Sequence, residues 1–359
     1  MGNGYRYNIA DNLLPMVQLL NKYASRWHCL DFYAIPHDLL SAFKIDLNDP
    51  GLQGALALPL HTVNIRSDPA QRWVGASPIV QGLSPTVVKL SRVPFPLIGI
   101  SWSRVTRVQA LGFSLDECIE LLRRAPLLAH CMFLEVRHDQ QKYPLLNGNI
   151  IHTGLNLLQV QLDGSILNTF LRHLSFPSLL ELSLGDSPIT DELLSFIERS
   201  PVLKTLNLIG PIFEHGSELI RVLSTTPALT HLFILLYTSS PLPIHHLFTH
   251  LAESWLVEDA SEQFLPKLQS LHYTGYSSNP WDDLSTVFGP ISEITNPRRR
   301  PFNQLRFKCL DAAVEDDEHD ANMMRLVPLK DAGIDLKIMD YNGKDLLENY
   351  LSSSLQNIP

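Results

Sequence analysis

A short pattern that recurs along the chain limits its fold more than any other feature of the sequence. A proline is followed two residues later by a leucine, and two further residues separate that leucine from an apolar–any–apolar triplet. Pro177-Ser-Leu179-Leu-Glu-Leu182-Ser-Leu184 shows the full pattern. Other full copies begin at Pro126, Pro201, Pro227 and Pro266. Weaker copies without this proline begin at Trp27, Leu60, Val105 and Leu155, and Leu305-Arg-Phe307 begins one further strand. A recurring unit of this kind indicates an array of similar elements.

The spacing of the copies narrows the class of repeat. From Val105 to Leu229, the first apolar positions of successive copies lie 23 to 27 residues apart. Leucine-rich repeats are about 20–29 residues long. The next two intervals, which end at Leu268 and Leu305, are 39 and 37 residues. We expect these two to be repeats with inserted loops.

Each copy predicts a strand, and the segments between copies predict helices. In Leu182-Ser183-Leu184 a period of two sends both leucines to one face and the serine to the other. Ser114 and Glu117 have capping-box spacing at the start of one helix. Ser187-Pro188 is expected to open another. The sequence therefore predicts an α/β fold: a right-handed leucine-rich-repeat solenoid (horseshoe), with parallel strands on the concave face and helices outside.

We expect one domain over residues 1–359, because no Gly/Ser-rich linker divides the chain. Residues 1–57 are assigned to an N-terminal capping region, 58–310 to repeats and 311–359 to a C-terminal capping region. Leu13, Leu14, Val17 and Leu20 fit an amphipathic N-terminal helix. Near the other end, residues 320–333 are expected to form a helix and 334–338 a closing strand.

Composition excludes several classes of protein. The hydrophobic content is 45% and the net charge is −9, which argues against a disordered chain and against binding to nucleic acid or anionic membranes. Four scattered cysteines, at 29, 118, 131 and 309, indicate neither a disulfide framework nor a zinc cluster. The first residues lack the apolar stretch of a secretory signal. The expected location is cytoplasmic or nuclear.

Several segments resemble a known family. They are Ser25–Leu30, Ile100–Thr106, Asp116–Leu128, Phe176–Leu184 and Phe196–Ser200. Together they make the chain similar, over roughly its whole length and in order, to the large fungal, mainly mushroom-type, family of F-box proteins with leucine-rich-repeat tails. No F-box-like Leu-Pro-x-Glu segment occurs near residue 1, and residues 1–30 resemble the region after the F-box. Either a truncated gene sequence or a member without the docking element would explain this.

The resemblance implies a function. Family members are substrate receptors of cullin-type ubiquitin ligases, in which the F-box docks the ligase adaptor and the repeats hold the target protein. It therefore implies a cullin-ligase adaptor as a second partner, if an upstream F-box exists.

Three polar motifs are candidate sites of chemistry. His245, His246 and His250 have a spacing that could place two metal ligands on one helix face, but no third ligand is evident, and a solvated helix face is expected. The acidic run at 315–320 is expected to be a solvated loop before a helix. Arg298-Arg299-Arg300 is expected to be a basic loop.

No catalytic motif is seen, so we expect no enzyme, no metal and no cofactor. The alternative is an active site in the long loops after Leu229 or Leu268.

The candidate binding site is the strand face that points away from the leucines. It is polar, nearly uncharged and contains Met and aromatic side chains, which suits a protein partner. Its expected residues are Arg107, Gln109, His130, Met132, Gln159, Gln161, Glu181, Ser183, Thr205, Asn207, His231, Phe233, Ser270 and His272. The sequence thus predicts a non-catalytic protein-interaction module, in keeping with the target-recognition part of an F-box receptor. The alternative is a repeat scaffold or regulator unconnected to ubiquitination.

Overall fold

The computed structural model describes residues 9–43, 60–68, 73, 77–138, 142–144, 149–186, 188–210, 216–237, 242–255, 264–276, 281–310 and 317–356. Contacts divide the chain into two compact units, Met1–Leu162 and Asp163–Pro359. Each unit is described by itself. The prediction of a single domain stays a prediction, as do the three regions assigned within it.

The first unit contains a run of parallel strands in chain order, β1-β2-β3-β4-β5-β7. Its strands are β1 (Cys29–Tyr33), β2 (Thr62–Arg66), β3 (Val87–Ser91), β4 (Arg107–Leu111), β5 (His130–Leu134), β6 (Ile150–Ile151) and β7 (Leu157–Gln161). Its helices are α1 (Ile9–Asn21), α2 (His37–Ala42) and α3 (Leu115–Arg124), with 3₁₀ turns at Ala24–Arg26, Phe95–Leu97 and Trp102–Arg104.

Strand β3 was not expected from the sequence. Val88 and Leu90 point into the core, as the leucines of the other strands do. Three residues before Val88, where most other copies have leucine or valine, the chain has Pro85, and this proline is buried. The repeat was therefore missed because proline replaces the aliphatic residue that marks its start.

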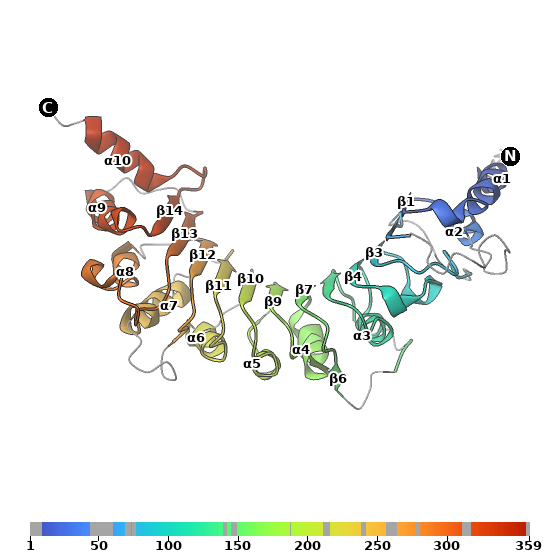
Figure 1. Cartoon of the computed structure of the whole chain (residues 1–359), viewed down its shortest axis with the longest axis horizontal. Coiled ribbons are helices and arrows are strands. Elements are labelled where there is room, and N and C mark those ends of the chain that lie inside the picture. The colour runs from blue at the N-terminus through green and yellow to red at the C-terminus, as the bar shows by residue number, and fades with distance from the viewer. Residues whose placement is uncertain are drawn as a thin grey trace, which may run out of the picture. The chain divides into compact units, whose positions relative to one another are not determined.

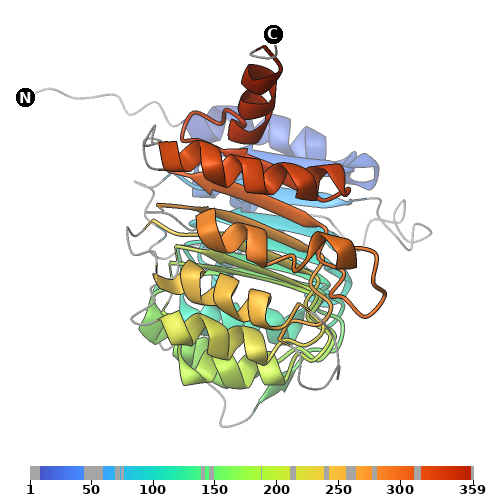
Figure 2. The same cartoon turned by 90° about the vertical axis from the view of Figure 1, so that its left-hand side faces the viewer.

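The second unit has the same architecture, with parallel strands in the order β9-β10-β11-β12-β13-β14. Its strands are β8 (Leu174–Ser175), β9 (Glu181–Gly185), β10 (Thr205–Ile209), β11 (His231–Leu235), β12 (Ser270–Gly275), β13 (Gln304–Cys309) and β14 (Asp335–Met339). Its helices are α4 (Gly164–Arg172), α5 (Asp191–Glu198), α6 (Gly216–Ser224), α7 (Leu242–Glu253), α8 (Trp281–Thr286), α9 (Asp317–Asp331) and α10 (Leu346–Gln356), with a 3₁₀ turn at Ile291–Glu293. Helices α5 to α9 lie on one side of these strands, leaving the other face of the sheet uncovered by helices (Figure 1). Successive helices from α6 to α9 pack side by side (Figure 2).

A spine of leucines runs through the second unit. Leu206 is in register with Leu182 on one side and with Leu232 on the other. The exposed fractions of Leu182, Leu206 and Leu232 are 0%, 0% and 2%. The register continues through Leu271 to Leu305 and Leu336. Each leucine fills the space between two neighbours, so the repeats share one continuous buried row. The predicted α/β leucine-rich-repeat solenoid is confirmed.

Helix α5 starts later than the sequence suggested. It begins at Asp191, and the Thr190 hydroxyl accepts a hydrogen bond from the backbone N–H of Leu193 at 3.4 Å. Threonine is a good N-cap, so Thr190 and not Ser187 takes this role. Ser187 lies outside the described residues. Helix α9 and strand β14 fall close to the ranges expected for them.

The arginine triplet corrects a second expectation. Arg298 is exposed, but the exposed fractions of Arg299 and Arg300 are only 9% and 2%. The Arg300 guanidinium donates to the carbonyl oxygens of Leu251, Ser254, Phe264 and Leu265 at 2.8–3.1 Å. It also donates to the Ser254 hydroxyl at 2.7 Å. The prediction of a basic loop is wrong for Arg299 and Arg300, because backbone carbonyls replace the water that a surface arginine would need.

The sequence also predicts a turn at Asn147-Gly148 and a helix start at Asn279-Pro280. These residues lie outside the described part of the chain, as do the first residues of the acidic run, Glu315-Asp316.

Candidate protein-binding face

The face of the second unit that carries no helices presents two aligned rows of side chains. The first row contains Glu181, Thr205, His231 and Ser270, which are neighbours in the strand register. The second row contains Ser183, Asn207, Phe233 and His272, two residues further along each strand. The strand register brings all eight side chains together on one face, and all eight belong to the predicted set.

In the first unit the rows are similar, with one difference from the prediction. Arg107 and His130 share the first row, and Gln109, Met132 and Gln159 share the second. In strand β7 the row positions are Leu157 and Gln159, so the predicted pair, Gln159 and Gln161, starts one row too late. Gln161 lies two residues beyond the second row. Leu157 is not in the predicted set.

Most row residues are half-buried between their neighbours, but Arg107 and His231 are exposed, as is Gln161 beyond the rows. Ser183 is only 6% exposed, so it offers a partner little surface. Asn207 Nδ2 donates a hydrogen bond to Glu181 Oε1 at 3.1 Å. This bond ties the two rows together and partly offsets the negative charge of Glu181.

The second row includes an aromatic pair on strands β11 and β12. The rings of Phe233 and His272 are 4.8 Å apart and nearly perpendicular, at 85°. Burial lowers the pKa of His272, and the nearby positive charge of Arg306 lowers it further. A neutral imidazole beside a phenyl ring gives this part of the face a largely apolar character at neutral pH.

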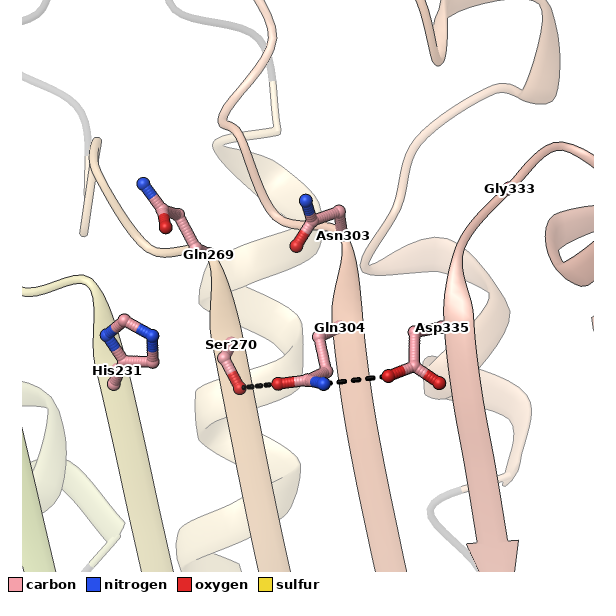
Figure 3. Close-up of a pocket in the computed structure, with 7 residues that line it drawn as sticks. All are labelled: His231, Gln269, Ser270, Asn303, Gln304, Gly333 and Asp335. Atoms are coloured by element: carbon pink, nitrogen blue, oxygen red, sulfur yellow. Dashed lines mark hydrogen bonds between the residues drawn. The ribbon is translucent and has the colours of Figure 1, made fainter.

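A polar pocket opens at the beginning of strands β11 to β14 (Figure 3). Its volume is about 310 Å³. Ser270 Oγ donates to Gln304 Oε1, and Gln304 Nε2 donates to Asp335 Oδ2, both at 2.7 Å. This chain of hydrogen bonds crosses three strands and fixes the orientation of the Gln304 amide. The lining residues are His231, Gln269, Ser270, Asn303, Gln304, Gly333 and Asp335.

Sequence reasoning missed the charged end of the face. Gln304, Arg306 and Lys308 project from β13, and Asp335 and Lys337 from β14, in the same alternation as the rows. Arg306 Nη2 lies 3.9 Å from Asp335 Oδ2. The sequence does predict the start of a strand at Leu305-Arg-Phe307, and alternation along this strand would have identified Arg306 as an outward residue. The expectation of a nearly uncharged face is wrong for strands β13 and β14.

The polar motifs considered for chemistry do not assemble into a site within the described residues. His245, His246 and His250 are exposed on α7. In that part of the chain, no cluster of at least three His, Cys, Asp or Glu side chains is placed to bind a metal ion.

No described helix combines the length and apolar character needed to cross a membrane.

Comparison with known proteins adds little to this description. No protein-family model matches the chain, and no curated protein matches it. Among solved structures there is a distant likeness to the crystal structure of a TLR13–ssRNA13 complex, at 13% sequence identity and a TM-score of 0.25. The match covers 77% of this chain and 48% of that one, so this chain spans about half the length of its counterpart. The fold assignment rests on the strand register and not on this likeness.

Proposed function

We propose that the protein is a non-catalytic interaction module that binds a partner protein on the helix-free face of its strands. The observation that supports this most is the alignment of the two rows in register across successive strands. Repeat proteins use such extended faces as binding surfaces. Half-buried Phe233 and His272 provide the aromatic contacts that are enriched at interfaces.

The finer proposal is that the bound protein is a ubiquitylation target, and that the chain is the target-recognition part of an F-box-type receptor in the cytoplasm or nucleus. The family resemblance of Asp116–Leu128 and Phe176–Leu184 supports this. A receptor of this kind acts by positioning its target near the transferring enzyme. The alternative is a scaffold that binds proteins but has no link to ubiquitylation.

Site-specific photo-crosslinking tests the binding face. A photoreactive amino acid is placed at Thr205, on the face, or at Glu198, exposed on helix α5 of the same repeat array. We expect crosslinked partner proteins from position 205 and few from position 198. Equal crosslinking from both positions, or none from position 205, would contradict the proposal.

A separate experiment tests the link to ubiquitylation. The protein is expressed from its natural transcript, including any coding sequence upstream of Met1, and is precipitated from cells. Retention of the cullin adaptor supports the receptor. Face crosslinks without adaptor retention would favour the scaffold.

A further inference from the structure

We propose that the face of strands β10 to β14 binds an extended acidic protein segment, whose carboxylates contact Arg306, Lys308 and Lys337 and whose apolar side chains contact Ile209, Phe233 and Leu235. This inference rests on the proposed function, and it specifies the chemistry of the partner. We call the first three residues the basic cluster and the last three the apolar cluster.

The basic cluster concentrates positive charge on a protein that is negative overall. Arg306 and Lys337 are register partners on neighbouring strands, and Lys308 follows Arg306 on the same face. Like charges directly opposite each other destabilise a sheet. The whole chain has a net charge of −9, so this local reversal of sign favours an anionic partner.

The cluster is only partly neutralised from within the protein. Asp335 is near Arg306, but at 3.9 Å, and both side chains are more than 40% exposed, at 46% and 42%. Asp335 also accepts a hydrogen bond from Gln304. Within the described part of the chain, Lys308 and Lys337 have no ion-pair partner. A partner's carboxylate could therefore pair with these two ammonium groups and with the exposed end of the Arg306 guanidinium.

The apolar cluster lies next to the basic cluster on the same face. Ile209 and Leu235 are register partners, and Phe233 is on the same strand as Leu235. All three are half-buried, with part of each side chain exposed. His272 and Thr274 on β12 separate them from Arg306 and Lys308 on β13. A segment crossing these strands would meet apolar groups first and cations next.

The pocket beside the clusters suits the backbone of such a segment. Gln269 and Asn303 extend into the region above the Ser270–Gln304–Asp335 chain of hydrogen bonds (Figure 3). Their amides can both donate and accept hydrogen bonds. Peptide groups have the same two functions, so this pocket can satisfy a partner's main chain.

The composition of the face favours a protein over a nucleic acid. Binding to nucleic acid draws on several cations that follow a phosphate backbone. Here three cations occupy two adjacent strands, β13 and β14, and strands β10, β11 and β12 contain no lysine or arginine. A phosphate backbone crossing the face would meet cations at one end only, whereas a protein segment can be acidic at one end and apolar at the other.

The experiment uses fluorescein-labelled peptides and the full chain at low salt. One peptide has a Leu-Phe pair followed by a glutamate run, and the matched peptide has glutamine in place of each glutamate. Fluorescence anisotropy gives Kd. We expect the glutamate peptide to bind about tenfold more tightly or better, since charge-assisted hydrogen bonds replace neutral ones. The advantage should shrink as salt is added.

Variants connect the effect to the cluster. Arg306→Gln with Lys337→Gln should abolish the preference for glutamate. Arg172→Gln with Arg221→Gln removes the same charge from exposed ion pairs on α4 and α6, and should leave the preference unchanged. Circular dichroism and thermal melting confirm that both variants fold. Lys337→Glu, a single reversal of charge, should weaken binding further than Lys337→Gln.

Three outcomes overturn the proposal. Equal binding of both peptides would show an apolar but not an acid-selective face. No peptide binding, with crosslinks still found at position 205, would reject the acidic segment and leave the proposed function standing. A single-stranded RNA oligonucleotide that binds as tightly as the glutamate peptide, and loses affinity in the Arg306/Lys337 variant, would assign the cluster to nucleic acid instead.

Discussion

The regular repeats around β9 and β10 and the long repeats after β11 reach the same strand register by different means. From Leu179 to Leu229 the repeat length stays at 24 and 26 residues, whereas the following repeat to Leu268 has 39. The strands on both sides of this insertion remain parallel and in register. Helix packing and the leucine spine stabilise the regular repeats, but the long repeat also needs a buried cation.

Arg300 shows why an apolar core alone is not enough there. The chain segments that end α7 and precede β12 leave backbone carbonyls pointing inward, and a leucine cannot satisfy them. Buried carbonyls without partners are costly. The guanidinium donates to four of them. Burial lowers the Arg300 pKa to about 10, with a smaller contribution from neighbouring Arg299, so the side chain remains charged at neutral pH.

In the first unit a buried negative charge has the role that buried Arg300 has in the second unit: it forms hydrogen bonds with backbone groups outside the regular strands and helices. Glu117 on α3 is fully buried and accepts hydrogen bonds from the backbone N–H groups of Phe95 and Ser114 at 3.3 and 3.0 Å. It also pairs with Lys142 Nζ at 3.2 Å. Next to it, Asp116 Oδ2 accepts from the backbone N–H groups of Lys142 and Tyr143. In both units, a buried charge fixes irregular backbone against the regular array.

The largest effect is expected from Arg300→Met. The variant keeps the volume of the side chain but leaves the four carbonyls without a donor. A buried acceptor left without its donor costs about 1–3 kcal/mol, so four such carbonyls should together cost about 3 kcal/mol or more. Chemical denaturation should show this loss in the free energy of unfolding. Arg298→Met, at the exposed residue of the triplet, is the control and should change stability by less than about 0.5 kcal/mol. Equal stability of the two variants would mean that Arg300 does not organise the long repeat.

Leu206→Ala tests the regular repeats, where no buried charge is involved. Leu206 is fully buried between Leu182 and Leu232, and a Leu→Ala change at such a site costs about 2–5 kcal/mol. Thr205→Ala, the neighbouring residue on the open face, should cost far less. If both substitutions cost the same in denaturant titrations, the assignment of inner and outer faces is wrong.

Glu117→Gln tests whether the buried carboxylate of Glu117 stabilises the first unit. The amide keeps the shape and one acceptor oxygen, but it loses the charge that pairs with Lys142 and cannot accept with both oxygens. Hydrogen bonds to charged groups contribute about 1.5–3 kcal/mol, so we expect a loss of about 2 kcal/mol in the free energy of unfolding. Glu198→Gln, on the exposed surface of α5, is the matched control. A loss no larger than that of the control would assign Glu117 a passive role.

The smallest effect concerns pH and His272. The groups that face this ring include Phe233 and His231 on β11 and Arg306 and Lys308 on β13. Because folding lowers the pKa of His272, the unfolded chain binds more protons as pH falls through about 6.5. Wild-type stability should therefore decline slightly more than that of His272→Gln between pH about 7.5 and about 5.5. Parallel curves for the two proteins in thermal melts would contradict the lowered pKa.

The sequence allowed most of the fold to be predicted because leucine spacing reports directly on strand register. Leu182, Leu206 and Leu232 lie where their pattern placed them. The prediction failed where a residue other than leucine occupies a buried position that stabilises the repeat. Pro85 replaced an aliphatic anchor, and Arg300 looked like a surface cation because local sequence does not show which carbonyls will surround it.

The candidate face was predictable in part for the same reason. Period-two alternation identifies outward residues once a strand is recognised, which placed His231 and Phe233 correctly. It could not identify Arg306 and Lys337 as neighbours, since 31 residues separate them and only the register between β13 and β14 brings them together.

Hydrogen exchange measured by mass spectrometry tests most directly whether one spine continues through regular and long repeats. We predict that amides of 231–235 and 270–275 exchange at similarly slow rates in the wild-type protein. In Arg300→Met the protection of 270–275 should fall, while that of 205–209 persists. Fast exchange of 270–275 in the wild-type protein, at the rate of surface loops, would contradict a continuous spine.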